Sequence, residues 1–314
     1  MAQHLAAEGH EVVVLDSLAT GHRGAVKWGP LVQADLLDKA SLASVFKSSR
    51  FDAVMHFAAK SLVGESVADP YSYYANNVSG TLNLLSTMRE HGVGRIVFSS
   101  TAAVFGEPLS AVIDENHPKD PINPYGASKL MAERLLSDAA AAYGLRSVSL
   151  RYFNAAGALP QHGIGEAHVC ETHLIPNVLR AALGKSPALK VFGSEYGTPD
   201  GTCVRDYVHV QDLARAHALA LEYMDQSPGA HSFNLGNGQG FSVLDVIQTA
   251  EKVAGMKVPY ELAAPRAGDP ARLVASAKRA RSELGWQPTW TELGPIMESA
   301  WRWHKDQPAW SLPQ

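Results

Sequence analysis

Short apolar runs rich in β-branched residues alternate with longer segments of helical periodicity through the first half of the chain. Runs that are apolar at nearly every position predict strands buried on both faces of a parallel sheet. Helices are predicted from Ser41, from Asp69-Pro70 to about Glu90, and from Asn123-Pro124 to about Tyr143. This alternation favours an α/β fold with a doubly wound parallel sheet. The predicted strands are 11–15 (EVVVL), 29–34, 53–57 (AVMHF), 95–99 (RIVFS) and 147–152 (SVSLRY).

The pattern loosens from about residue 155, where glycine, proline and polar residues become frequent. Helices are predicted there at 174–184, 211–224, 242–255 and 292–305. We therefore expect a Rossmann-like domain at 1–155 and a smaller α+β domain at 156–314 that closes over the edge of the sheet. Some segments of the second part are expected to return to the first.

Composition narrows the classes of partner. The 314 residues are 46% apolar and 18% charged, with a formal net charge of −4, so we expect no nucleic-acid partner. No apolar run approaches the ~18 residues of a membrane span, and the first residues lack the order of a signal peptide. Two cysteines cannot form a disulfide framework, which favours the reducing cytoplasm.

Tyr125 and Lys129 are the first candidates for chemistry, because residues four apart on a helix share one face. A lysine ammonium beside a phenol is expected to lower the pKa of the tyrosine from ~10 toward neutrality, which suits proton transfer. Ser99, Ser100 and Thr101 follow the predicted strand at 95–99, and a hydroxyl from Ser100 or Thr101 could orient the same substrate oxygen.

Polar residues also follow two other predicted strands, Asp16 after 11–15 and Asn154 after 147–152. Ligands of such sheets bind beyond the carboxyl ends of the strands. An acid at the end of the second strand of a dinucleotide fold binds the adenosine ribose, and Asp16 suits that role and favours NAD; the alternative is a plain turn aspartate. The glycine fingerprint expected ~20 residues earlier falls before Met1. We therefore expect a Rossmann-like domain without its first strand and glycine loop, from a truncated or misassigned start.

Together with these residues, several longer motifs resemble the extended short-chain dehydrogenase/reductase family, and within it the UDP-sugar 4-epimerases. The resemblance covers nearly the whole chain. The motifs are HFAA at 56–59, GES at 64–66, YANNVSGT at 74–81, LRYFN at 150–154, DGTCVRDYVH at 200–209, NLG at 234–236 and RAGD at 266–269.

The resemblance implies an enzyme that interconverts UDP-glucose and UDP-galactose with NAD. Tyr125 removes the proton of the sugar 4-hydroxyl while the hydride passes to NAD, and the 4-keto sugar then turns and is reduced on its other face. Lys129 holds down the pKa of the tyrosine and binds the nicotinamide ribose. Thr101 assists at the sugar oxygen, with support from Ser100.

The resemblance also implies two sets of binding residues. The cofactor set is Asp16, Asp35, Leu36, Phe57, Ala58, Asn76, Ser99, Tyr125, Lys129 and Phe153. The substrate set is Thr101, Asn154, His173, Leu174, Phe192, Arg205, Tyr207, Arg266, Asp269 and Leu273. Two arginines suit a diphosphate, because each guanidinium binds phosphate oxygens bidentately. The family also implies a homodimer through the helices at Asp69–Glu90 and Tyr125.

Three other functions compete with this hypothesis. A nucleotide-sugar dehydratase needs an added acid and base, usually where this chain has Ala102 and Ala103, and alanines cannot move protons. An epimerase for pentoses or N-acetylated sugars stays open, because Leu273 is intermediate in size where the family gates the sugar pocket. A non-catalytic, truncated nucleotide-sugar binder is the third.

Metal-like spacing occurs in His168-x-Cys170-x-x-His173. A zinc site needs a fourth ligand, and the sequence shows no second cluster that supplies one. We therefore expect no metal.

Overall fold

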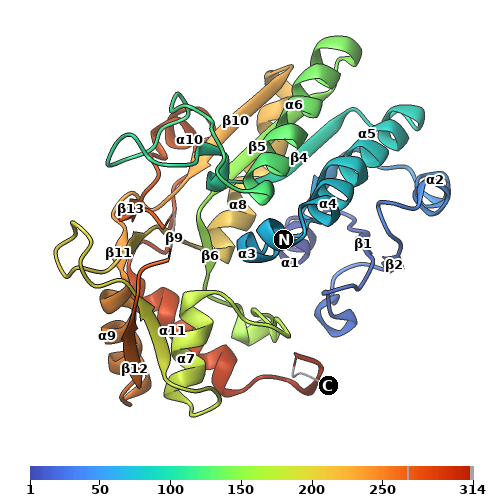
Figure 1. Cartoon of the computed structure of the whole chain (residues 1–314). Helices are drawn as coiled ribbons and strands as arrows, with labels where there is room; N and C mark the ends of the chain where they lie inside the picture. The colour runs from blue at the N-terminus through green and yellow to red at the C-terminus, as the bar shows by residue number, and fades with distance from the viewer. Residues whose placement is uncertain (267–268, 312–314) are drawn as a thin grey trace.

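A parallel sheet of four strands forms the centre of the structure, a computed structural model that describes residues 1–266 and 269–311 (Figure 1). β1 (Val14–Asp16) and β2 (Leu31–Gln33) form a second parallel pair, and no ladder joins this pair to the larger sheet within those residues. The expected α/β fold with parallel strands is confirmed. The order of the larger sheet is β3 (Val54–His56), β4 (Arg95–Thr101), β5 (Arg146–Tyr152) and β10 (Ala230–Leu235).

Helices cover both faces of this sheet because β4 is apolar on both sides. Ile96 and Phe98 pack into a core with α2 (Lys39–Ser48), α5 (Gly80–Glu90) and α6 (Pro124–Tyr143). Val97 points the other way, into a core with α8 (Val210–Gln226). Consecutive residues of β4 therefore face different helices, and this alternation decides where the polar residues at its end point.

Some predicted boundaries were wrong. The strand expected at 11–15 is β1, which begins only at Val14 and is half-buried rather than buried, because it pairs with β2 alone. Ser99, Ser100 and Thr101 were expected just past the strand but form the last residues of β4. α2 begins at Lys39, since the Asp38 side chain accepts hydrogen bonds from the next turn.

The long helix expected after Asp69 is broken in the middle. It consists of α4 (Pro70–Tyr73), a π-helical segment η2 (Tyr74–Ser79) and α5. Asn77 lies in the π-helical segment, and its side chain bonds the backbone of Lys60 and the hydroxyl of Ser128 on α6. The segment therefore holds the loop after β3 against the helix that carries Tyr125.

The second half of the chain has its own core, formed by α7 (Leu174–Ala182), α9 (Val243–Ala254) and α11 (Leu293–Lys305). These helices and α8 confirm the four predicted there. α9 begins with a capping box between Ser242 and Asp245. No helix among the described residues is long and apolar enough to span a bilayer.

Outside the larger sheet, the described strands of this half form short ladders of two or three strands (Figure 1). They are β6 (Asn154–Ala156) with β9 (Tyr207–His209), β7 (Leu189–Phe192) with β12 (Tyr260–Ala263), and β8 (Val204–Arg205) between β11 (Phe241–Ser242) and β13 (Arg272–Leu273). The remaining helices are α1 (Ala2–Ala7), α3 (Val63–Ala68) and α10 (Lys278–Glu283), with 3-10 turns η1 (Arg23–Ala25), η3 (Ala102–Phe105), η4 (Pro160–His162) and η5 (Ala309–Ser311).

Candidate active site

Tyr125 lies in the first turn of α6, close to the end of β4. The Asn123 side chain caps this turn by accepting a hydrogen bond from the Gly126 amide at 2.9 Å. A Cβ on Gly126 would meet the carbonyl oxygen of Ala103 at 2.4 Å, so only glycine lets the helix approach η3 this closely. The Thr101 hydroxyl consequently lies within hydrogen-bonding reach of the Tyr125 phenol.

Lys129 is buried one turn further along α6. Its ammonium donates to the carbonyl oxygen of Ser99 at 2.8 Å and lies 4.7 Å from the centre of the Phe98 ring. Burial lowers the pKa of Lys129 to about 7, and the nearby Glu133 carboxylate opposes this shift.

The expected lowering of the tyrosine pKa was wrong for this structure. Burial raises the pKa of Tyr125 to about 12, and the bond to Thr101 opposes that shift without outweighing it. The physical reason is that the Lys129 ammonium is turned toward the Ser99 carbonyl, so desolvation dominates at the phenol.

Strand alternation separates the three hydroxyls at the end of β4. The Ser99 hydroxyl lies 2.5 Å from the Tyr152 hydroxyl, on the same side of the strand as Thr101. The Ser100 hydroxyl points to the opposite face and donates to Glu133 at 2.6 Å. Ser100 is thus held by Glu133 further along α6, whereas Thr101 lies within hydrogen-bonding reach of Tyr125.

Sequence reasoning missed the partner of Ser100. Glu133 and Arg151 form a buried ion pair, with hydrogen bonds of 2.8 and 2.5 Å from the guanidinium to the two carboxylate oxygens. Two signals could have found it. Glu133 is one turn after Lys129 on the same helix, and Arg151 is a charged residue in an otherwise buried strand. The pair fixes α6 against β5, next to the candidate catalytic residues.

Several of the residues predicted to bind the cofactor lie at or just after the carboxyl ends of strands. The Asp16 carboxylate ends β1 and accepts the Leu18 amide at 2.7 Å, and Asp35 follows β2 and accepts the Leu37 amide at 2.8 Å. Leu36 is buried beside it. Of the others, Phe57 and Ala58 are exposed after β3, Asn76 donates to Asn77 within η2, and Phe153 follows β5 and packs against the core of η3.

Four residues predicted to bind the substrate form two adjacent pairs in the second half of the chain. Arg205 on β8 is ion-paired with Asp269. The Arg266 guanidinium lies 3.9 Å from the centre of the Phe192 ring, which ends β7. Ala267 and Gly268 of the same motif lie outside the described residues.

The remaining residues of the predicted substrate set each contact other parts of the protein. Asn154 donates to the carbonyl oxygen of Asp206 at 2.9 Å, and Tyr207 is buried with its pKa raised by burial. Leu273 pairs with Arg205 across two strands and packs against the core of η3. Leu174 begins α7, and the ring of His173 before it contacts Glu166.

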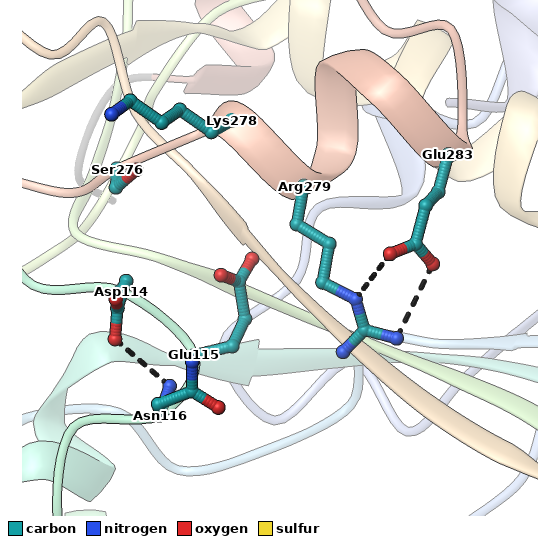
Figure 2. Close-up of a pocket in the computed structure, with 7 residues that line it drawn as sticks. All are labelled: Asp114, Glu115, Asn116, Ser276, Lys278, Arg279 and Glu283. Atoms are coloured by element: carbon teal, nitrogen blue, oxygen red, sulfur yellow. Dashed lines mark hydrogen bonds and ion pairs between the residues drawn. The ribbon is translucent and has the colours of Figure 1, made fainter.

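A separate cavity of about 450 Å³ lies between α10 and the loop around Asn116 (Figure 2). None of the predicted site residues lines it. Arg279 is held by Glu283 at 2.8 Å, and Glu115 accepts the backbone amide of Asn234 at 2.8 Å. Arg279 also donates to the Ser232 carbonyl at 3.3 Å, so these charged groups join α10 and the loop at Glu115 to β10.

Comparison with known proteins identifies the class. The model of the NAD dependent epimerase/dehydratase family matches residues 1–236, and the chain belongs to this family. It is 50% identical to the UDP-glucose 4-epimerase of Halalkalibacterium halodurans over 301 residues, which cover 96% of this chain and 90% of that protein.

Solved structures agree. A crystal structure of UDP-glucose 4-epimerase superposes with a TM-score of 0.95 at 47% identity, over 98% of this chain and 94% of that one. The enzyme from Brucella ovis in complex with NAD superposes with a TM-score of 0.93 at 47% identity, over 96% and 92% of the two chains.

Proposed function

We propose that the protein is an NAD-dependent isomerase that interconverts UDP-glucose and UDP-galactose by changing the configuration at C4 of the sugar. Family membership and the likeness to UDP-glucose 4-epimerases support this function. The structural observation that carries it is the meeting of Thr101, Tyr125 and Lys129 at the carboxyl end of β4.

The side chains at the sheet edge fit NAD. A Cβ on Gly21 would come within 2.8 Å of both Asp16 carboxylate oxygens, so this glycine keeps the carboxylate open for ribose hydroxyls. Asp35 and Leu36 lie at the end of β2 for the adenine, and Lys129 uses one donor on Ser99 and keeps others for the nicotinamide ribose. NAD, when bound, accepts and returns the hydride.

The chain's own residues handle the proton and the position of the sugar. Tyr125 takes the proton of the 4-hydroxyl and gives it back when the 4-keto sugar, turned over in the site, is reduced on its other face. Thr101 holds the same oxygen through its hydroxyl. Lys129 is proposed to favour the phenolate once its ammonium turns from the Ser99 carbonyl toward the phenol. Ser100 supports indirectly, by fixing the end of β4 through Glu133.

Arg205 and Arg266 are proposed to bind the diphosphate of the substrate, and Asp269 a ribose hydroxyl. Asp269 holds the Arg205 guanidinium and Phe192 supports that of Arg266, so both cations are oriented before a ligand arrives. Asn154, His173, Leu174, Tyr207 and Leu273 complete the proposed substrate set. Leu273 packs against the core of η3 and pairs with Arg205, which supports a role for it in the sugar pocket.

We propose further that residues 1–155 bind NAD and 156–314 bind the UDP-sugar, with β10 returning to the sheet. The enzyme is proposed to be a cytoplasmic homodimer without a nucleic-acid or membrane partner. Exposed apolar side chains along α3 to α5 support the dimer: Val67, Tyr71 and Leu82. Light scattering of the purified chain tests it, and Tyr71→Glu is expected to give monomers.

The proposed function is tested by incubating the chain with NAD and UDP-galactose and measuring UDP-glucose by chromatography. Net conversion in both directions, to one equilibrium ratio, is the expected result. Binding of UDP-galactose without conversion would favour the non-catalytic binder. Release of water to give a 4-keto-6-deoxy sugar would favour a dehydratase, although Ala102 and Ala103 lack the groups for it.

A further inference from the structure

A cluster of four side chains with metal-binding groups lies in the loop before α7, and one of them, His173, also belongs to the proposed substrate set. It consists of Glu166, His168, Glu171 and His173, whose nearest ligand atoms all lie within 4.8 Å of one another. Sequence reasoning considered the histidines together with Cys170 and found no fourth ligand. The structure brings in two glutamates instead.

Three of the distances within the cluster are close to those between the ligands of a tetrahedral metal centre. Ligands bonded to Zn²⁺ at about 2.0–2.1 Å lie roughly 3.3 Å apart. The Nδ1 atom of His168 lies 3.1 Å from the Glu166 carboxylate and 3.5 Å from that of Glu171. The Nδ1 atom of His173 lies 3.8 Å from Glu171 and contacts Glu166 directly. Both imidazoles therefore present the same nitrogen toward the two carboxylates.

The ligand set selects for a transition metal. Two imidazole nitrogens and two carboxylate oxygens suit Zn²⁺, whereas Mg²⁺ and Ca²⁺ prefer oxygen ligands alone. Two ionised carboxylates balance the charge of a divalent ion. Among the described residues these carboxylates form ion pairs only with His168 and His173.

The loop around the cluster is held from outside, as metal ligands usually are. The Trp303 indole donates to the Glu166 carbonyl at 2.7 Å, and the His22 ring lies 2.7 Å from the Ala167 carbonyl. The backbone amides of Thr172 and His173 donate to Glu171 at 2.8 and 2.9 Å, which fixes that carboxylate.

A second observation points to a ligand at this place. A cavity of about 220 Å³ is lined by Glu166, His168, Glu171 and His304. His304 is only 4% exposed, and its Nδ1 atom has no hydrogen-bond partner among the described residues. This buried ring nitrogen leaves a place for an ordered water beside the four ligands, and its lack of a partner marks the cavity as a place for a polar ligand. Arg180 and Lys185 also line this cavity, but the Lys185 ammonium is turned to the His304 carbonyl at 2.9 Å.

We propose that Glu166, His168, Glu171 and His173 bind one Zn²⁺ or a similar transition-metal ion that fastens this loop. The site is structural: it closes eight residues of chain onto one ion, immediately before Leu174 at the start of α7. The ion takes no part in proton transfer at C4, because in the described structure no hydrogen bond or ion pair joins these side chains to Tyr125 or Thr101. Glu166, His168 and Glu171 lie outside the proposed substrate set, so they separate the metal site from substrate binding.

The test uses the whole chain, stripped with EDTA and then titrated with Zn²⁺ in a calorimeter. One Zn²⁺ per chain is expected, with a rise in Tm of about 5 °C at a hundredfold excess over Kd, and no rise with Mg²⁺ or Ca²⁺. Glu166→Gln and His168→Gln should each weaken binding at least about tenfold. Absence of stoichiometric binding, or unchanged binding in both variants, overturns the proposal.

Two matched controls separate this site from other zinc-binding side chains. Cys170→Ser removes an exposed thiol in the same loop, and His231→Gln removes a half-buried histidine elsewhere; both should keep full Zn²⁺ binding. Loss of binding in Cys170→Ser would assign the ion to the thiol and overturn the ligand set.

The parent protein loaded with Co²⁺ gives a readout that does not depend on variant folding. A tetrahedral visible spectrum without a thiolate charge-transfer band is expected, and such a band would contradict the four assigned ligands.

Discussion

The two sides of the candidate active site differ in how deeply their charged side chains are buried. On the β4 and α6 side, Ser100 and Lys129 are 2% and 3% exposed, and burial sets the pKa values. On the β7 and β8 side, Arg266 is exposed and Arg205 is half-buried, and each is held by one partner. Proton transfer needs a shifted pKa and therefore burial, whereas binding a diphosphate needs cations that a ligand can reach.

Replacing Tyr125 is expected to have the largest effect, because the buried side does the chemistry. Tyr125→Phe should lower kcat by about 10²- to 10⁴-fold, since general acid–base catalysis contributes that much. The Kd for UDP, measured by calorimetry, should stay within about twofold. An equal loss of UDP affinity would instead show that Tyr125 has a structural role, and that the two sides do not divide chemistry from binding.

Breaking the buried ion pair should cost the most stability. Glu133→Ala leaves the Arg151 guanidinium buried without its carboxylate and is expected to lower the free energy of unfolding by about 3–5 kcal/mol. Urea unfolding measures this. The exposed pair Arg134–Asp138 on the same helix is the control, and Asp138→Ala should cost less than about 1 kcal/mol. Similar losses in both variants would mean that burial does not distinguish the two pairs.

Acid should destabilise the buried side through His56. Burial, with the nearby Lys129, lowers the pKa of His56 from 6.5 to about 3 in the folded protein. Below pH 6.5 the unfolded chain therefore binds the proton and the folded protein does not, so stability falls as pH falls. His56 should account for about 2 kcal/mol of the loss between pH 7 and pH 5. Urea unfolding of His56→Gln should show that much less dependence on pH, while His231→Gln keeps the parent slope.

Replacing an exposed cation should affect binding and leave stability almost unchanged. Arg266→Ala is expected to raise the Kd for UDP by about 10- to 100-fold, because hydrogen bonds to charged groups contribute about 1.5–3 kcal/mol. Its free energy of unfolding should change by no more than about 0.5 kcal/mol. Arg266→Lys keeps the charge and loses the bidentate contact, so its Kd should lie between those of parent and alanine variant. A large loss of stability would mean that Arg266 stabilises the fold, as the buried residues near β4 and α6 do.

Elements with local signals could be predicted from the sequence. Asn123, Pro124 and Gly144 mark both ends of α6, and Ser242 marks the start of α9. The parallel sheet followed from apolar runs between helical segments. The shortened β1 could not be predicted, because its length depends on having a single neighbour.

The chemistry of the site was less predictable than its location. The sequence placed Tyr125, Lys129 and the hydroxyls at one edge of the sheet, which the structure confirms. It did not give the direction of the tyrosine pKa shift, because desolvation depends on how closely η3 and α6 pack. It also did not reveal that Ser100 faces Glu133, since the pairing of β4 with its neighbours decides which of its residues face each side of the sheet.

The π-helical segment between α4 and α5 sets the rotational phase of the chain that follows it. A single added residue turns everything after it by about 100° about the helix axis. α4 packs on α6 and α5 packs on α2, so the parts of the helix before and after the π-helical segment pack against different helices. Deleting one residue between 74 and 79 would restore α-helical winding and swing Leu84 and Met88 away from the core they share with α2. This short stretch should therefore tolerate substitutions better than changes in length.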